Sequence, residues 1–342
     1  MSETFHVGVT RDFLGSDGTF SYGENCFRLL DEASDVEWEF LADKTAELRP
    51  DQIQSYDALL LLIPRITAAT LEGADRLKVI ARFGVGYDTI DVEACTQAGV
   101  MLTITPDGIR QPVAASVMTF MLALSHKLFL KDKLTRAGRW NEKLDHMGMG
   151  LTGRTLGVIG YGNIGREVFR LARPFGMHHL AYDPYVNEAD SADTDVTLTD
   201  LETLLKTSDF VSICCQLTPE TRHLINAERL ALMKPTSYLI NMARGPVVDQ
   251  KALTQVLQER KIQGAGLDVF EQEPIDPDDP ILKLDNVIVT PHGICWTDEA
   301  FSGNGRSACE SILDIAAGRI PQHVVNRDVL ESARFKEKTN FA

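Results

Sequence analysis

One segment limits the possible fold more than any other, because an apolar stretch, three closely spaced glycines and a helical pattern follow one another without interruption. Residues 155–159 are rich in β-branched and aliphatic side chains, which predicts a buried strand. Gly160, Gly162 and Gly165 then have the spacing G-x-G-x-x-G at the start of a helix expected over 164–175. This order is typical of the first β-α-β unit of a doubly wound parallel sheet, so an α/β fold is predicted.

The three glycines and a later acidic residue predict a dinucleotide site. Gly160 permits a tight turn, Gly162 lets backbone N–H groups approach a diphosphate, and Gly165 allows helix and strand to pack closely, with the diphosphate at the positive end of the helix. Asp183 ends a second strand expected over 179–182, where a carboxylate accepts hydrogen bonds from both ribose hydroxyls and repels a 2′-phosphate. We therefore expect NAD rather than NADP. The alternative, glycines that serve only as turn formers, leaves Asp183 unexplained.

Two series of strand and helix patterns follow one another along the 342 residues, so two domains are expected. Both series alternate in the way that predicts parallel sheets with helices on their faces. Only the second series contains the glycine motif. The predicted strands of the first series are 6–9, 36–40, 58–63, 78–82 and 100–103. Those of the second are 155–159, 179–182, 210–214, 238–241, 265–269 and 287–290, with helices over 199–206 and 249–259.

Helices are also predicted between the two series and after the last strand of the second. Residues 111–124 predict a mostly apolar helix, which has to be covered either by its own domain or by another chain. A polar stretch over 138–150 follows it. After the last strand, a helix is predicted over 306–317 and ends at Gly318.

Charge and composition disfavour several classes of partner. Lys and Arg total 34 against 49 Asp and Glu, a formal net charge of -15, and this mean field repels nucleic acid and anionic membranes. The start of the chain has no signal-peptide pattern, and the longest strictly apolar run, 58–63, is too short to cross a bilayer. We therefore expect a cytoplasmic protein without nucleic-acid or membrane partners. The six cysteines have no metal-ligand spacing, which predicts reduced thiols and no metal site.

Four polar residues lie at the ends of predicted strands of the second series, where open α/β sheets bind their ligands. Arg244, which precedes Gly-Pro, is expected to face the crevice as an anion clamp, with a surface arginine as the alternative. Asp268 either belongs to the site or caps the following turn. His292 is a candidate general acid/base, and the carboxylate of Glu273 would orient its ring. Each of these could be a structural polar group by itself, and the set together indicates catalysis.

Five segments, in order over residues 77–325, resemble the NAD-dependent D-2-hydroxyacid dehydrogenase family, which includes phosphoglycerate, glycerate and lactate dehydrogenases. These segments are 82–91, 153–165, 241–245, 266–274 and 286–292. The first 70 residues match only in rhythm. The resemblance implies a Rossmann NAD-binding domain, 105–297, inserted into a flavodoxin-like substrate domain formed by 1–104 and 298–342. It also implies a cleft that closes over the reactants and, with the apolar helix 111–124, a homodimer.

The resemblance also assigns roles to single residues. It makes His292 the acid/base, Glu273 its partner and Arg244 the clamp on the substrate carboxylate and carbonyl. The amides of Asn163 and Ile164 would hold the diphosphate, and Asp268 would lie near the nicotinamide carboxamide. Further implied cofactor contacts are Thr221, Met242 and Ala243. The implied backbone nest for the substrate carboxylate is the loop Phe83, Gly84, Val85 and Gly86.

The implied reaction interconverts a small D-2-hydroxy acid and its 2-keto acid by hydride transfer with NAD(H). Two alternatives stay open, which are a phosphite dehydrogenase of the same superfamily and an NAD-sensing scaffold that resembles transcriptional corepressors. Glu273 argues against a formate dehydrogenase, because those enzymes pair the histidine with glutamine. Trp296 would either line the substrate pocket or fill the hinge, and Arg65 is either an anion contact or a solvated arginine.

Overall fold

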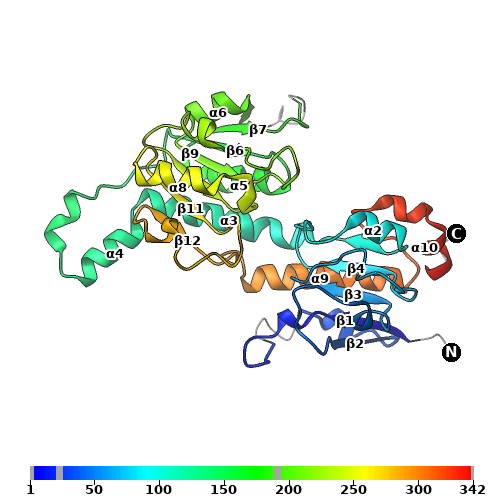
Figure 1. Cartoon of the computed structure of the whole chain (residues 1–342). Coiled ribbons are helices and arrows are strands. Elements are labelled where there is room, and N and C mark those ends of the chain that lie inside the picture. The colour runs from blue at the N-terminus through cyan, green and yellow to red at the C-terminus, as the bar shows by residue number, and fades with distance from the viewer. Residues whose placement is uncertain (1–3, 21–25, 188, 190–193, 340–342) are drawn as a thin grey trace. The chain divides into compact units, whose positions relative to one another are not determined.

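The chain divides into two compact units, each with one parallel sheet. The computed structural model describes residues 4–20, 26–187, 189 and 194–339. One unit consists of Met1–Ile109 with Trp296–Ala342, and the other of Arg110–Cys295 (Figure 1). The expected insertion, 105–297, begins five residues before the observed second unit and ends two residues after it.

The first unit contains a five-stranded parallel sheet of order β2-β1-β3-β4-β5. Its strands are β1 (Phe5–Val9), β2 (Val36–Phe40), β3 (Ala58–Leu61), β4 (Val79–Arg82) and β5 (Met101–Thr103). Its α-helices are α1 (Arg28–Asp31), α2 (Val92–Gln97), α9 (Asp298–Ala316) and α10 (Ala333–Thr339). The order is that of flavodoxin-like folds, so the predicted fold of this unit is confirmed.

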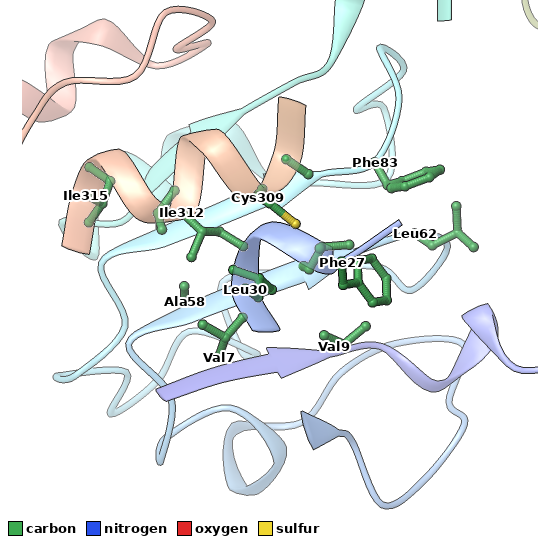
Figure 2. Close-up of a cluster of buried hydrophobic side chains, with 14 of the residues drawn as sticks. Val7, Val9, Phe27, Leu30, Ala58, Leu62, Phe83, Cys309, Ile312 and Ile315 are labelled. Carbon is green, nitrogen blue, oxygen red and sulfur yellow. The ribbon is translucent and has the colours of Figure 1, made fainter. Parts of the chain in front are cut away.

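Strands β1, β3, β4 and β5 of the first unit are largely buried on both faces, whereas the edge strand β2 exposes alternate residues. Successive side chains point to opposite faces of each strand. On one face, Val7, Val9 and Ala58 pack with apolar residues of α1 and α9, such as Leu30 and Ile312 (Figure 2). A separate cluster, to which Leu59, Leu61 and Ile80 belong, holds the alternate residues of the same strands. The continuous apolar runs in the sequence are therefore strands covered on both faces.

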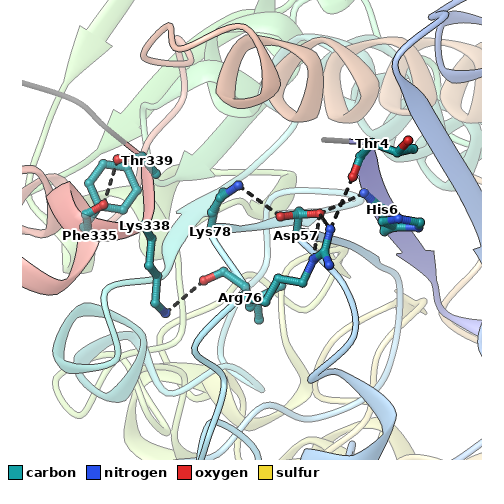
Figure 3. A network of polar contacts seen from close by, with 9 residues as sticks. Thr4, His6, Asp57, Arg76, Lys78, Phe335, Lys338 and Thr339 are labelled. Atoms are coloured by element: carbon teal, nitrogen blue, oxygen red, sulfur yellow. Dashed lines mark hydrogen bonds and ion pairs between the residues drawn. The ribbon is translucent and has the colours of Figure 1, made fainter. Parts of the chain in front are cut away.

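A buried carboxylate connects the amino ends of three strands in the first unit, β1, β3 and β4. Asp57 precedes β3 and accepts hydrogen bonds from Arg76 Nη2 at 2.7 Å, Lys78 Nζ at 3.0 Å and the His6 backbone N–H at 2.9 Å (Figure 3). Burial by itself would raise the pKa of Asp57, but these bonds outweigh it and hold the pKa below its ordinary value. Nearby, the Lys338 ammonium donates to the carbonyl of Leu77 at 3.0 Å (Figure 3).

The second unit contains a seven-stranded parallel sheet of order β12-β11-β10-β9-β6-β7-β8, the doubly wound arrangement expected for it. Its strands are β6 (Thr155–Ile159), β7 (His178–Tyr182), β8 (Val196–Leu198), β9 (Phe210–Ile213), β10 (Tyr238–Asn241), β11 (Gly264–Leu267) and β12 (Val287–Val289). Its helices are α4 (Leu128–Arg136), α5 (Asn163–Ala172), α6 (Leu201–Thr207), α7 (Ala227–Leu230) and α8 (Gln250–Gln258), together with most of α3 (Pro106–Ser125).

Two helices begin earlier than predicted. Helix α3 begins at Pro106 rather than 111, and its Phe120 packs against Gly266 of β11, where a Cβ would lie 2.8 Å from the ring. Of the two alternatives for this helix, burial in its own unit is therefore the one observed. Helix α9 begins at Asp298 rather than 306. Gly303 and Gly305 have low helix propensity, but a Cβ at Gly305 would collide with Cys26, so glycine is needed there for packing.

The described helices and cysteines can be compared with the expectations from composition. No single described helix is long and apolar enough to cross a membrane, although α3 and α4, bent by 53° at the break between them, reach that length and composition as a pair. All six cysteines are free thiols, and Cys26, Cys95, Cys295 and Cys309 are buried. Burial raises the pKa of the Cys95 thiol to about 12, which disfavours the reactive thiolate.

Candidate active site

The three glycines of the G-x-G-x-x-G motif lie in three different environments between β6 and α5. Gly160 has φ +99°, and a Cβ there would lie 2.7 Å from the backbone nitrogen of Cys215. A Cβ on Gly165 would collide with the carbonyl of Gly160, so this glycine permits the close contact of helix and turn. At Gly162, by contrast, a Cβ would meet nothing within 4 Å. The backbone is therefore open at the position where a diphosphate is expected.

The N-terminus of α5 has the donors that such a group needs. Gly162 is the N-cap residue and provides no side-chain cap. Within the described part of the chain, the N–H groups of Asn163 and Ile164 have no protein acceptor. A ten-residue helix with uncapped N–H groups attracts an anion through these donors and through its dipole. The residues present therefore fit a dinucleotide diphosphate.

The Asp183 carboxylate follows β7 and lies beside the glycine turn. Its Oδ2 accepts from the Tyr161 N–H at 2.9 Å and its Oδ1 from the Tyr185 N–H at 3.0 Å. Arg166 donates to the Tyr161 carbonyl at 3.1 Å and stacks on the Tyr161 ring at 4.4 Å. Asp183 is thus fixed by two backbone groups and remains only partly buried, as a residue that contacts a ribose has to be.

His292 and Glu273 form a direct pair. Nδ1 of His292 lies 2.6 Å from Oε2 of Glu273, and both side chains are partly exposed, by 43% and 35%. Oε1 of Glu273 accepts from the Phe270 N–H at 2.9 Å. Burial alone would raise the pKa of Glu273, but the bond and charge of His292, the Phe270 N–H and the charge of Arg244 hold it below its ordinary value. The carboxylate is therefore ionised and leaves Nε2 of the histidine as its outward nitrogen.

Asp268 orders the turn that carries His292. It follows β11 and is buried, and its Oδ1 accepts from Thr290 Oγ1 at 2.6 Å, Gly293 N–H at 2.9 Å and Ile294 N–H at 3.2 Å. His292 has φ +50°, a conformation that such a turn has to stabilise. Asp268 therefore caps a turn, which was one of the two alternatives for it, but this is the turn around His292 and not the turn that directly follows Asp268. Oδ2 of Asp268 receives no bond from the described residues.

Arg244 lies on a turn after β10 that its own strand supports. The buried Asn241 donates from Nδ2 to the Arg244 carbonyl at 3.0 Å and accepts from the Ala243 N–H at 3.1 Å. The Arg244 guanidinium donates to the Ala243 carbonyl at 2.7 Å, and its charge acts on Glu273. A Cβ on Gly245 would collide with the Phe270 backbone, so the turns after β10 and β11 are in contact.

The remaining cofactor candidates of this unit follow β9 and β10. Thr221 closes its own loop, since its hydroxyl donates to the Gln216 carbonyl at 2.7 Å and accepts from the Thr218 N–H at 2.7 Å. Met242 is buried at the end of β10, and Ala243 is half-buried beside it. No group of three or more His, Cys, Asp or Glu in the described ranges is arranged to hold a metal ion.

In the first unit, the loop after β4 has two of its amides already bonded. The Phe83 N–H donates to the Leu61 carbonyl at 2.8 Å, and the Gly84 N–H donates to Thr105 Oγ1 at 2.7 Å. Among the residues that the structure describes, the N–H groups of Val85 and Gly86 donate to no acceptor. Any anion that this backbone binds would therefore meet Val85 and Gly86 rather than the two residues before them.

Two further candidates of the first unit can be placed by their contacts. Trp296 packs edge-to-face on Phe301 with ring centroids 5.5 Å apart, and Phe301 lies 5.2 Å from the ring of Phe83. Trp296 is thus joined to the loop after β4 through one aromatic ring. Arg65 is exposed, and its backbone pairs with the segment of Ala46 and Leu48.

Several residues that shape these loops were not among the candidates chosen from the sequence. Asn241 could have been suspected, because it is a polar residue that ends an apolar strand. Thr105 and Asn304, joined by a 2.8 Å hydrogen bond, lie 199 residues apart, and no motif connects them. The same holds for His223 and Glu271, which are in contact 48 residues apart.

Comparisons with known proteins show the family to which the chain belongs. Residues 118–293 match the family model "D-isomer specific 2-hydroxyacid dehydrogenase, NAD binding domain". A glyoxylate reductase of Korarchaeum cryptofilum is 40% identical over 298 residues, which cover 86% of this chain and 90% of the relative. A D-3-phosphoglycerate dehydrogenase of Methanocaldococcus jannaschii is also 40% identical, over 89% of this chain and 57% of that protein. The solved structure of a D-lactate dehydrogenase from Aquifex aeolicus, complexed with NAD and lactic acid, has a TM-score of 0.81 and 29% identity, and the match covers 94% of this chain and 99% of that one.

Proposed function

Because the chain belongs to the D-isomer specific 2-hydroxyacid dehydrogenase family, and so is an NAD-dependent oxidoreductase of 2-hydroxy acids, we propose that it interconverts a small D-2-hydroxy acid and its 2-keto acid with His292 as the acid/base. The observation that carries the proposal is the 2.6 Å contact between His292 and an ionised Glu273, with the charge of Arg244 acting on the same carboxylate. The three groups follow β10, β11 and β12, at the carboxyl ends of the strands.

The proton and charge steps follow from these side chains. Bound NAD(H) supplies or accepts the hydride at the 2-carbon. In reduction, protonated His292 donates from Nε2 to the carbonyl oxygen of the keto acid, and in oxidation the same nitrogen takes the hydroxyl proton. Glu273 holds Nδ1, and the charge of a protonated His292 is among the causes that lower the pKa of Glu273, so the two charges attract each other while the ring is protonated. The Arg244 guanidinium stabilises the negative charge that develops on the oxygen, an effect worth about 3 kcal/mol or more for one such donor.

The cofactor contacts that we propose lie on the same unit. The amides of Asn163 and Ile164 would bind the diphosphate across the open side of Gly162, and Asp183 would accept from the ribose hydroxyls. Oδ2 of Asp268 would accept from the nicotinamide carboxamide, since Oδ1 is already committed to the turn of His292. We also place Thr221, Met242 and Ala243 beside the cofactor through the backbone of their loops, because the Thr221 hydroxyl is used within its own loop.

For the first unit, we propose that the loop after β4 is a small anion nest for the substrate carboxylate. Its donors that have no acceptor among the described residues are the amides of Val85 and Gly86. Phe83 and Gly84 would act by shaping the loop, since their amides are bonded to Leu61 and Thr105. Two successive N–H groups in a turn are sufficient to attract a carboxylate.

A substrate panel tests the proposal directly. NADH oxidation would be followed with glyoxylate, hydroxypyruvate, 3-phosphohydroxypyruvate and pyruvate, and NAD reduction with phosphite. We expect turnover with at least one 2-keto acid and a strong preference for NADH over NADPH. Turnover with phosphite alone would support the phosphite alternative, and no turnover with any compound would support a binding role.

The Glu273→Gln variant tests the role of the His–Glu pair. Without the carboxylate, the imidazolium form of His292 is less stable, so the pH at which reduction begins to fail should move to lower values. An unchanged pH profile would remove Glu273 from the role that we give it.

We also propose that the protein is a homodimer formed through the segment 126–149, which extends from the second unit as α4 and the residues after it (Figure 1). In this segment, five large apolar side chains are more than half exposed: Leu128, Phe129, Trp140, Leu144 and Met147. Such a concentration is unfavourable in water and suits a second copy of the same segment. The double change Trp140→Glu and Leu144→Glu should convert a dimer to a monomer in light scattering, whereas Ile320→Glu, at an exposed apolar residue elsewhere, should not.

A further inference from the structure

A second histidine–glutamate pair lies next to the pair of His292 and Glu273. The ring of His223 contacts the carboxylate of Glu271, and Glu271 stands two residues before Glu273 on the turn after β11. We propose that His223 and Glu271 are positioning residues, which fix this turn so that Glu273 meets His292. This inference rests on the proposed function, because it concerns the geometry of the same acid/base pair.

His223 connects three loops through its backbone and its ring. Its N–H donates to the Pro246 carbonyl at 2.8 Å, on the turn that follows Arg244. The next residues continue this pairing, since the Ile225 N–H donates to the Val247 carbonyl at 3.0 Å. The ring extends to Glu271 on the third loop. His223 has φ +51°, a backbone conformation that residues other than glycine rarely adopt.

Glu271 is held at two points, which leaves its turn little freedom. Its N–H donates to Gln250 Oε1 at 3.0 Å, and its carboxylate contacts His223. Gln250 is itself fixed by Asp279, which accepts from Nε2 at 2.8 Å. On the other side, Gly245 lies directly against the Phe270 backbone, with no room for a Cβ.

The position of this turn determines how Glu273 is presented. The Glu273 side chain folds back, so that Oε1 accepts from the Phe270 N–H and only Oε2 reaches His292. A shift of the backbone between Phe270 and Glu273 would therefore lengthen the 2.6 Å contact with the histidine ring. A displacement of about 1 Å at a catalytic group is sufficient to reduce the rate strongly.

Charged groups around the pair do not provide an alternative partner for the ring of His223 in the described structure. Glu271 lines a shallow groove along α8 with Lys251 and Asp279, and Asp279 is already bonded to Gln250. The charge of Arg244 acts on Glu273. Removal of either member should therefore release the turn rather than exchange one bond for another.

Three variants separate positioning from simple structural support. His223→Asn keeps a residue that tolerates positive φ but is too short to reach Glu271, and Glu271→Ala removes the carboxylate. Glu271→Gln keeps an oxygen that can accept a hydrogen bond from the ring. Glu259→Gln, an exposed carboxylate at the end of α8, is the matched control for loss of charge.

We expect His223→Asn and Glu271→Ala each to lower kcat for keto-acid reduction by about threefold to tenfold. The kcat of the double variant should be no lower than that of the less active single variant, because the effects of two residues that act through one contact do not add. The KM for NADH should change by less than about twofold, because the glycine turn is untouched. Glu271→Gln should keep most of the activity, and Glu259→Gln all of it. In both impaired variants, the pH profile of reduction should move to lower pH, as in Glu273→Gln but by less.

The proposal is overturned if the losses of the two single variants multiply in the double variant, if kcat falls with no change of the pH profile, or if neither single variant has an effect. Should His223→Asn fail to fold, the comparison of Glu271→Ala with Glu271→Gln gives the same decision. The pH titration of the His292 ring, followed by NMR in the wild type and in these variants, needs no substrate. It therefore decides the positioning question even if the wild type turns over no keto acid and the proposed function fails.

Discussion

The two units are built alike at the amino ends of their strands and differ at the carboxyl ends. In each unit, a buried aspartate precedes a strand that pairs with the unit's first strand in chain order. Asp57 precedes β3, which pairs with β1, and Asp209 precedes β9, which pairs with β6. Asp209 accepts from the Thr155 N–H at 2.9 Å and pairs with Lys234 at 3.2 Å and Arg154 at 3.6 Å. Asp57 has the equivalent backbone donor and two cations of its own.

The carboxyl ends follow no common plan. In the second unit, the turns after neighbouring strands are joined by side-chain contacts of moderate sequence separation, such as Glu273 with His292 and Asp268 with Thr290. In the first unit, the loop after β4 is held through Thr105 and, beyond it, Asn304 of α9. The contacts that the two amino edges share therefore stabilise the sheets. We expect the chemistry to differ at the carboxyl edges, which are unlike.

The sharpest test of this division is His292→Asn, at the carboxyl edge of the second unit. Asparagine tolerates the positive φ of this position, so the fold should be kept, while kcat should fall by about 10²- to 10⁴-fold through loss of general acid/base catalysis. Steady-state kinetics and thermal unfolding are the measurements. His178→Asn, at an exposed histidine of the same unit, should leave kcat unchanged. A fall in stability in place of activity would contradict the assignment of this edge to chemistry.

A smaller effect is expected at the same edge for the cofactor. Asp183→Ala removes the proposed partner of the ribose hydroxyls, and hydrogen bonds to a charged group are worth about 1.5–3 kcal/mol, so the preference for NAD over NADP should fall by about tenfold to a hundredfold. Kd values for both cofactors would measure it. Asp183→Asn, which can still accept from the Tyr161 N–H, separates loss of charge from loss of the turn. Unaltered discrimination in both variants would contradict the ribose assignment.

The sequence predicted most of the elements but missed one strand and the start of one helix. Twelve strands are observed among the described residues, and the one that was not predicted is β8, a short edge strand over Val196–Leu198 without an apolar run. The start of α9 was missed because Gly303 and Gly305 look like helix breakers until Gly108 and Cys26 are seen to pack against them. Local patterns report burial and turns, whereas the reason for these glycines is a contact between distant segments.

The same limit applies to the candidate site. His292, Glu273 and Arg244 could be chosen because each follows a strand within a recognisable motif, and the structure brings His292 and Glu273 into contact. The pair His223 and Glu271 could not, because nothing near either residue in sequence indicates the other. Positioning contacts of this kind depend on how loops meet, and that is fixed only by the folded sheet.

At the amino edges, the two aspartates should contribute stability rather than activity. Asp57→Asn should lower the free energy of unfolding by about 1.5–3 kcal/mol, as loss of hydrogen bonds to a charged group does. Asp209→Asn should cost less, because its cations lie at 3.2 and 3.6 Å rather than 2.7 and 3.0 Å. Denaturant titrations of the two variants measure this. Equal costs would show that the charge pairs contribute little and that the backbone bonds dominate.

The pH dependence of Asp57 has a definite sign. Its pKa is held below the ordinary value of 3.8, so the stability it contributes is complete above that value and is lost as the pH falls through the lower pKa of the folded state. The gap in stability between the wild type and Asp57→Asn should therefore be constant from about pH 7 to pH 5 and close below about pH 4. A gap that widens on acidification would mean that the carboxylate is not stabilised in the folded protein.

The smallest effect is expected from Thr105→Val, which tests whether the carboxyl edge of the first unit is held from a distance. Valine has the shape of threonine, but the Gly84 N–H would lose its acceptor and Asn304 its donor. If the amides of Val85 and Gly86 bind the substrate carboxylate, a looser loop should raise the KM for the keto acid by about twofold to tenfold, with kcat nearly unchanged, since one neutral hydrogen bond is worth about 0.5–1.5 kcal/mol. Thr103→Val, at a buried threonine whose hydroxyl makes no bond to this loop, is the control. If both variants raise KM alike, or if Thr105→Val lowers kcat instead, the loop is not a binding element and the first unit contributes to the reaction in another way.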